Sequence, residues 1–169
     1  MSHNIHVILA KKSICDDISQ KYDHAHVLEL EQDFALIPMT ASLIDEIQEE
    51  FHSKKSLAEG FVFLNAEIME FLSIISDDQS ICYFETRYNG AVGTQSALMY
   101  MNKQLIGPFH TETIWDEDRK ELKDIPKDHR AVNKVLYKMD VHCKYRDEFG
   151  ALNLPRYNSM EIILKALNN

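Results

Sequence analysis

The chain has 169 residues, of which 45% are hydrophobic and 27% are charged. This is the composition of an ordinary globular protein, and we expect a single domain over residues 1–169. The formal net charge of −9 argues against direct binding of nucleic acid, which needs clustered lysines and arginines. Because no basic segment precedes a long apolar run, we expect a cytoplasmic protein with no signal peptide and no membrane span.

Short apolar runs in the first part of the chain predict strands, and helical periodicity predicts helices between them. Residues 5–10 form a candidate buried strand, and residues 27–37 form a candidate hairpin that ends at Pro38. Thr40 or Ser42 can cap the helix that follows. The outer side of that helix carries four carboxylates: Asp45, Glu46, Glu49 and Glu50.

The clearest amphipathic helix follows Asn65, a residue type that caps helices well. Its apolar residues recur at positions i, i+3, i+4 and i+7, and they are Ile68, Phe71, Leu72 and Ile75. The same periodicity predicts two further helices, over residues 132–139 and 160–167.

The centre of the chain, residues 80–107, predicts an antiparallel sheet. Two strands flank a glycine-bearing turn at residues 89–93, and Asn102–Lys103 forms a two-residue turn into a short third strand. Isolated helices without a regular βαβ order favour an α+β fold, with the helices packed mainly on one face of this sheet. Residues 109–130 carry mixed charges, which predicts an exposed loop or a short surface helix.

Charged residues on the central strands are the best candidates for a polar site. Glu85 and Arg87 share a strand face with apolar side chains, because strand side chains alternate. They could form a site with Gln95 and with Arg156 from a later loop. The alternative is structural: an ion pair between Glu85 and Arg87, a hydrogen-bonded Gln95 amide, and an Arg156 that pins its loop. We favour the structural interpretation.

Other motifs give no catalytic or metal site. Gly90 and Gly93 lack the lysine and serine of a phosphate-binding loop, so we interpret them as parts of a turn. His24 and His26 could share one strand face, but a zinc site needs three or four ligands. The three cysteines are widely spaced and are expected to be reduced thiols. We therefore expect no metal, no cofactor and no catalytic residue.

Two segments resemble an uncharacterised bacterial family. The run at residues 85–90, with Gly93 and Gln95, is similar to the family's E-T-x-Y-x-G-x-x-G-x-Q segment. Residues 147–157 are similar to its C-terminal D-E-F-x-x-L-x-L-x-R-Y segment. The family has no established activity, so the resemblance implies a fold more than a function. In its compact, acidic form the chain is similar in type to immunity proteins encoded beside bacterial toxins.

The leading hypothesis is a cytoplasmic immunity protein, not an enzyme, that binds and neutralises a bacterial toxin domain. A toxin that acts on nucleic acid must be basic, and an acidic partner gains electrostatic steering and complementarity against it, so a basic nuclease is the expected partner. Two alternatives stay open: a small hydrolase or transferase that uses the polar site, and a regulatory module that binds a small ligand. The candidate partner-binding residues are the acidic clusters Asp45, Glu46, Glu49, Glu50, Asp116, Glu117 and Asp118.

Overall fold

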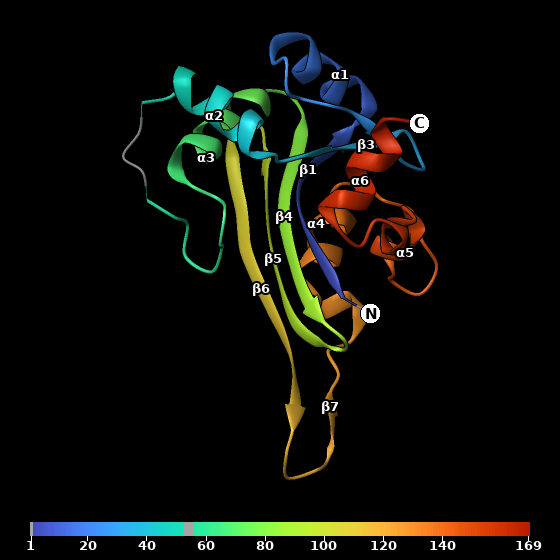
Figure 1. Cartoon of the computed structure of the whole chain (residues 1–169). Helices are drawn as coiled ribbons and strands as arrows, with labels where there is room; N and C mark the ends of the chain where they lie inside the picture. Colours follow the sequence, from blue (N-terminus) through green and yellow to red (C-terminus); the bar gives the residue numbers. More distant parts are fainter. Residues whose placement is uncertain (1, 53–55) are drawn as a thin grey trace.

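The computed structural model describes residues 2–52 and 56–169 and places seven strands in one antiparallel sheet, in the order β2-β3-β1-β4-β5-β6-β7 (Figure 1). The strands are β1 (His3–Lys11), β2 (Leu28–Glu29), β3 (Phe34–Pro38), β4 (Ser80–Asn89), β5 (Val92–Met101), β6 (Gln104–Asp116) and β7 (Glu121–Lys123). The helices are α1 (Lys12–Lys21), α2 (Ala41–Glu50), α3 (Ala66–Ile75), α4 (Ala131–Lys138), α5 (Glu148–Ala151) and α6 (Met160–Leu167), with 3-10 turns η1 (Lys127–His129) and η2 (Leu154–Arg156). Within the described ranges, no helix is both long enough and apolar enough to cross a bilayer.

The central strands are apolar on both faces of the sheet. In β4, Ile81 and Tyr83 lie in one hydrophobic core, whereas Cys82 and Phe84 lie in the other. Residues 97–100 of β5 alternate between the two cores in the same way. A continuous apolar run of this kind needs cover on both faces.

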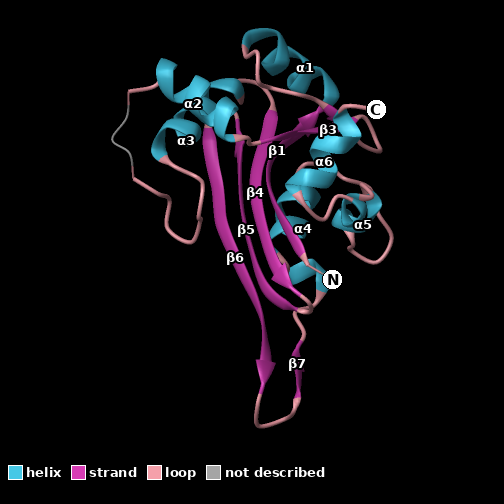
Figure 2. Cartoon of the chain, in the orientation of Figure 1, coloured by secondary structure: helices cyan, strands magenta, loops and turns pink. Residues whose placement is uncertain are grey.

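Helices supply that cover on each side of the sheet (Figure 2). The helices α1, α2 and α3 pack against the face that carries Tyr83, here called the α1–α3 face. The helices α4, α5 and α6 pack against the face that carries Phe84, here called the α4–α6 face. The α+β class and the antiparallel sheet are confirmed. The helices, which we expected mainly on one face, are divided between both, because residues 81–84 are buried from both sides.

Two helix N-termini begin where the sequence indicates. The Thr40 hydroxyl accepts a hydrogen bond from the N–H of Leu43 at 3.3 Å and caps α2. The Asn65 amide oxygen accepts one from the N–H of Ile68 at 3.0 Å and caps α3. These caps fix the ends of the two helices nearest the predicted acidic cluster.

The third strand of the central sheet is much longer than expected. The turn at Asn102–Lys103 has φ of 50° and 62°, as a two-residue hairpin turn requires. β6 then continues to Asp116, through the residues expected to form an exposed loop, and pairs with β7 at its end. Together β6 and β7 form a hairpin that projects beyond the body of the protein (Figure 1).

Candidate functional site

Glu85 lies on β4, on the α1–α3 face, and is only 3% exposed. Its Oε2 accepts a hydrogen bond from the N–H of Val62 at 2.8 Å. Its Oε1 accepts from the N–H groups of Phe63 and Leu64 at 2.8 and 3.1 Å, and from the Tyr83 hydroxyl at 2.8 Å. All four donors are neutral. The carboxylate therefore anchors residues 62–64 to the sheet, and the expected ion pair with Arg87 is replaced by backbone donors.

The other residues of the predicted polar site lie apart from Glu85. Gln95 faces the opposite side of the sheet, where its Oε1 accepts from the N–H of Val132 at 3.3 Å. Arg87 is exposed on the α1–α3 face, and Arg156 is exposed in η2, with its guanidinium 5.1 Å from the ring centre of Tyr157. The structure does not bring these four residues together into one site.

A serine and a histidine that sequence reasoning passed over lie side by side on β5 and β6. The Nδ1 atom of His110 is 2.9 Å from the Oγ of Ser96. The Ser96 hydroxyl donates its single proton to the carbonyl of Gly60 at 2.6 Å, so the histidine must be the donor in its contact with Ser96. A histidine that acts as general base would have to accept a hydrogen bond from the serine hydroxyl, which is the reverse of this arrangement. The pair is therefore a structural link between the two strands.

Two of the four α2 carboxylates bind the end of α1. Glu46 accepts hydrogen bonds from the N–H groups of residues 23 and 24 at 2.7 and 3.0 Å. Glu50 pairs with the Lys21 ammonium at 2.6 Å and accepts from the Tyr22 hydroxyl at 2.5 Å. Glu46 and Glu50 therefore hold α1 and α2 together.

The remaining two, Asp45 and Glu49, are exposed on the outer side of α2. They are one helical turn apart, so they project from the same side of the helix. These two residues are the part of the predicted cluster that is available to a partner.

The second acidic cluster lies at the tip of the β6–β7 hairpin, at the other end of the molecule from α2 (Figure 1). Asp116 shapes the turn, because its Oδ1 accepts from the N–H groups of Asp118 and Arg119 at 3.1 and 3.0 Å. Glu117 and Asp118 are exposed. Neighbouring basic residues at positions 119, 120 and 123 offset much of this negative charge. The two acidic clusters therefore cannot belong to one compact contact surface.

Charge is divided unevenly along the chain. Residues 1–79 contain 15 acidic and five basic side chains, whereas residues 80–169 contain 12 acidic and 13 basic ones. The first segment supplies α1, α2 and α3, and the second supplies α4, α5 and α6. The excess negative charge of the protein is therefore concentrated in the segment that builds the α1–α3 face.

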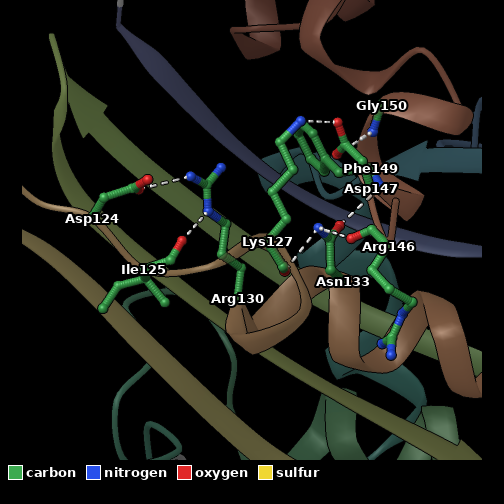
Figure 3. Close-up of polar contacts among 9 residues, drawn as sticks. All are labelled: Asp124, Ile125, Lys127, Arg130, Asn133, Arg146, Asp147, Phe149 and Gly150. Atoms are coloured by element: carbon green, nitrogen blue, oxygen red, sulfur yellow. Dashed lines mark hydrogen bonds and ion pairs between the residues drawn. The ribbon is translucent and has the colours of Figure 1, made fainter. Parts of the chain in front are cut away.

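A cavity of about 310 Å³ opens on the α4–α6 face, beside the ends of β4 and β5. Its walls include Thr86, Gln95, Lys127, Arg130, Asp147 and Phe149. Figure 3 shows that Lys127 reaches toward Asp147 in front of the Phe149 ring, while Arg130 points toward Asp124. Burial tends to raise the pKa of Asp147, but the hydrogen bonds from Lys127 and the N–H of Gly150 lower it below its ordinary value. The aspartate therefore stays ionised beside the lysine.

The buried side chain of Asn133 joins the three segments behind this cavity (Figure 3). Its Nδ2 donates to the carbonyl oxygens of Lys127 and Arg146 at 3.0 and 3.4 Å, and its Oδ1 accepts from the N–H of Phe149 at 2.9 Å. Sequence reasoning expected a pinned loop between residues 147 and 157 but missed Asn133, Lys127 and Arg130. No local pattern marks them, because the cavity exists only once the segments around them meet.

Neither histidines nor cysteines gather into a further site. Within residues 2–52 and 56–169, no group of three His, Cys, Asp or Glu side chains is placed to hold a metal ion. All three cysteines are free thiols. Burial raises the pKa of Cys15 to about 12 and that of Cys82 further, so neither is a reactive thiolate at neutral pH.

Comparison with protein-family models, with curated proteins and with solved structures found no match to this chain. The resemblance of residues 81–161 to an uncharacterised bacterial family therefore stays an expectation.

Proposed function

We propose that this chain is an inhibitor protein that binds a basic partner through its α1–α3 face. The observation that supports the proposal is the concentration of acidic residues in residues 1–79. An acidic surface speeds encounter with a partner of opposite charge and disfavours partners of like charge. Asp45 and Glu49 are the exposed carboxylates of α2 that can face such a partner.

The specific form of the proposal is a cytoplasmic immunity protein that neutralises a nuclease toxin domain. A nuclease must carry clustered lysines and arginines to hold its substrate, and an acidic protein surface can compete for the same cluster. The inhibition requires binding only, so the chain is assigned no catalytic step. The alternative enzyme hypothesis has no support from the predicted polar site, because Glu85 and Gln95 lie on opposite faces of the sheet.

The test is a pair of charge-reversal variants, Asp45→Lys/Glu49→Lys on α2 and Glu117→Lys/Asp118→Lys on the hairpin. Each replaces two exposed carboxylates with lysines, so the change in net charge is the same. Glu46 and Glu50 are left intact because they hold α1 to α2. The measurements are inhibition of the toxin domain encoded beside this gene and its association rate at two salt concentrations.

The α2 variant should associate at least about tenfold more slowly at low salt, with a smaller difference at high salt. The hairpin variant should bind nearly as fast as the unmodified protein. A slow hairpin variant would move the partner surface to the hairpin. Wild-type association for both variants would remove the electrostatic basis of the proposal, and failure of the unmodified protein to inhibit the toxin would remove the immunity assignment.

A further inference from the structure

The cavity on the α4–α6 face is a second candidate site, on the other side of the sheet from the proposed partner surface. We propose that it binds a small organic anion, with a carboxylate or phosphate between Lys127 and Arg130 and a flat apolar group against Phe149. This assignment does not depend on the immunity function. The cavity volume of about 310 Å³ is at the lower end of the range for small-molecule sites.

The charge on the walls favours an anion. Lys127 and Arg130 are two cations, and Asp147 is the acidic residue among the lining side chains. His3 also lines the cavity, and burial lowers its pKa below the ordinary value of 6.5, so it is neutral at physiological pH. The lining of this cavity therefore carries two cations and one carboxylate, and a second carboxylate, Asp124, pairs with Arg130 just outside it, within a protein whose overall charge is −9.

Arg130 keeps one edge of its guanidinium group available. Its Nε donates to the carbonyl of Ile125 at 3.0 Å, and its Nη2 donates to Asp124 at 3.1 Å. These bonds use the edge of the guanidinium formed by Nε and Nη2. The edge formed by Nη1 and the second N–H of Nη2 is left over. Figure 3 shows the remaining nitrogen on the side toward Lys127. The free edge of a guanidinium held in this way matches the two oxygens of a carboxylate or phosphate.

The supporting residues hold both cations in place before any ligand binds. Asn133 donates to the carbonyl of Lys127, and Arg130 is the N-cap residue directly before α4. The first N–H groups of α4 are already occupied by Thr111 and Gln95, so side chains and not the helix end must hold the charge. A preorganised site loses less conformational entropy when it binds.

The cavity also has an apolar wall and an adjacent cavity. The Phe149 ring is fixed by edge contacts with His3 and Phe84, at centroid distances of 5.4 and 6.4 Å. A neighbouring cavity of about 280 Å³ shares Tyr88 and Arg130 with the first, so the two are adjacent. A ligand with an aromatic or other flat group can therefore lie between Phe149 and Tyr88.

The experiment titrates the full chain with three probes, benzoate, phenyl phosphate and the neutral benzamide, and follows backbone amides by NMR. Benzoate or phenyl phosphate should cause saturable shifts at residues 86–95 and 147–150, and benzamide should bind at least about tenfold more weakly. The stronger of the two anions identifies the oxyanion type. Equal binding of benzamide, shifts that map elsewhere, or no saturable shift up to about 20 mM would overturn the proposal.

Variants locate the charge that binds. Arg130→Gln should weaken anion binding about tenfold. Arg130→Lys should weaken it less, because the positive charge remains although the paired N–H donors of the guanidinium are lost. Lys134→Gln on α4, outside the cavity lining, is the matched control and should bind like the unmodified protein. If Arg130→Gln lowers the melting temperature, Lys127→Gln replaces it, since that side chain is 51% exposed. Unchanged affinity in a folded variant would overturn the assignment.

Discussion

At the scale of single residues, Glu85 shows how one buried carboxylate can organise a distant segment. Strand alternation correctly places it on the face of Tyr83, next to apolar residues. Its partners could not be predicted, because residues 62–64 lie some twenty positions earlier and bind it through backbone N–H groups. Any sequence could supply those donors. The local pattern therefore reveals a buried charge but not what satisfies it.

Glu85→Ala should lower the free energy of unfolding by roughly 3 kcal/mol, because it leaves buried N–H groups and the Tyr83 hydroxyl without their acceptor. Glu85→Gln should also destabilise the fold, since an amide offers one acceptor oxygen where the carboxylate uses two. Urea unfolding measures both changes. Glu112→Gln, an exposed carboxylate on β6, is the control and should change stability little. A Glu85→Ala protein as stable as the unmodified one would contradict the anchoring role.

At the scale of elements, the α2 helix was predicted well, but its charged side was only partly understood. Periodicity identifies the buried residues, and Thr40 identifies the start. The four carboxylates looked equivalent in sequence, yet two of them hold the end of α1 and the other two project from the outer side of α2. The distinction depends on how α1 and α2 meet on the sheet, which helical periodicity does not describe.

The β6 strand was missed for a different reason. After Pro108 its residues are polar or charged at most positions, because β6 extends beyond the helices and most of its side chains there are exposed or only partly buried. A strand with little cover from helices lacks the apolar alternation by which strands are recognised. The charges at 116–118 are real surface features, and they lie at the exposed turn that joins β6 to β7.

The link between α1 and α2 should depend on pH. Two contacts lower the pKa of Glu50 below its ordinary value of 4.5. The larger effect comes from Lys21 and the smaller from the hydrogen bond with Tyr22. A lowered pKa in the folded state stabilises the protein above about pH 4.5, and this contribution is lost as the pH falls through the lowered value. Glu50→Gln should therefore be less stable than the unmodified protein at pH 6, and the difference should shrink as the pH falls below 4.5.

The expected difference at pH 6 is no more than about 1 kcal/mol, because the Glu50 side chain is 43% exposed and solvent screens the pair. Melting temperatures across the pH range provide the measurement. Glu49→Gln, on the outer side of the same helix, should show no such pH-dependent difference. A gap between Glu50→Gln and the unmodified protein that persists unchanged at pH 3 would show that the link is not electrostatic.

At the scale of the whole molecule, the sheet is shared by two hydrophobic cores. Continuous apolar runs in β4 and β5 imply that both faces of the sheet are covered, so the presence of two cores could be predicted from the sequence. The cavity near Lys127 could not be predicted in the same way. Its walls come from β1, β4, β5 and the segments before α4 and around α5, so it depends on the complete tertiary arrangement.

A buried thiol in each core offers a test of whether residues 1–169 unfold as one domain. Cys15 lies in the core under α1–α3, and Cys82 lies in the core under α4–α6. Because both cores pack on the same strands, losing one should expose the other, and the two thiols should become reactive at the same urea concentration. Pulsed alkylation followed by peptide mass spectrometry measures each site separately.

The third thiol supplies the internal reference for this experiment. Cys143 is partly exposed, so it should be alkylated before unfolding, while a Cys143→Ala protein should show only the two buried sites. Burial and the nearby Glu148 raise the pKa of Cys143, so its native reaction should be slow and should accelerate with rising pH. Alkylation of Cys15 at a clearly lower urea concentration than Cys82 would show that the α1–α3 layer opens by itself. The acidic surface proposed to bind a partner would then belong to a separately unfolding unit, and binding of the partner should raise the protection of Cys15 more than that of Cys82.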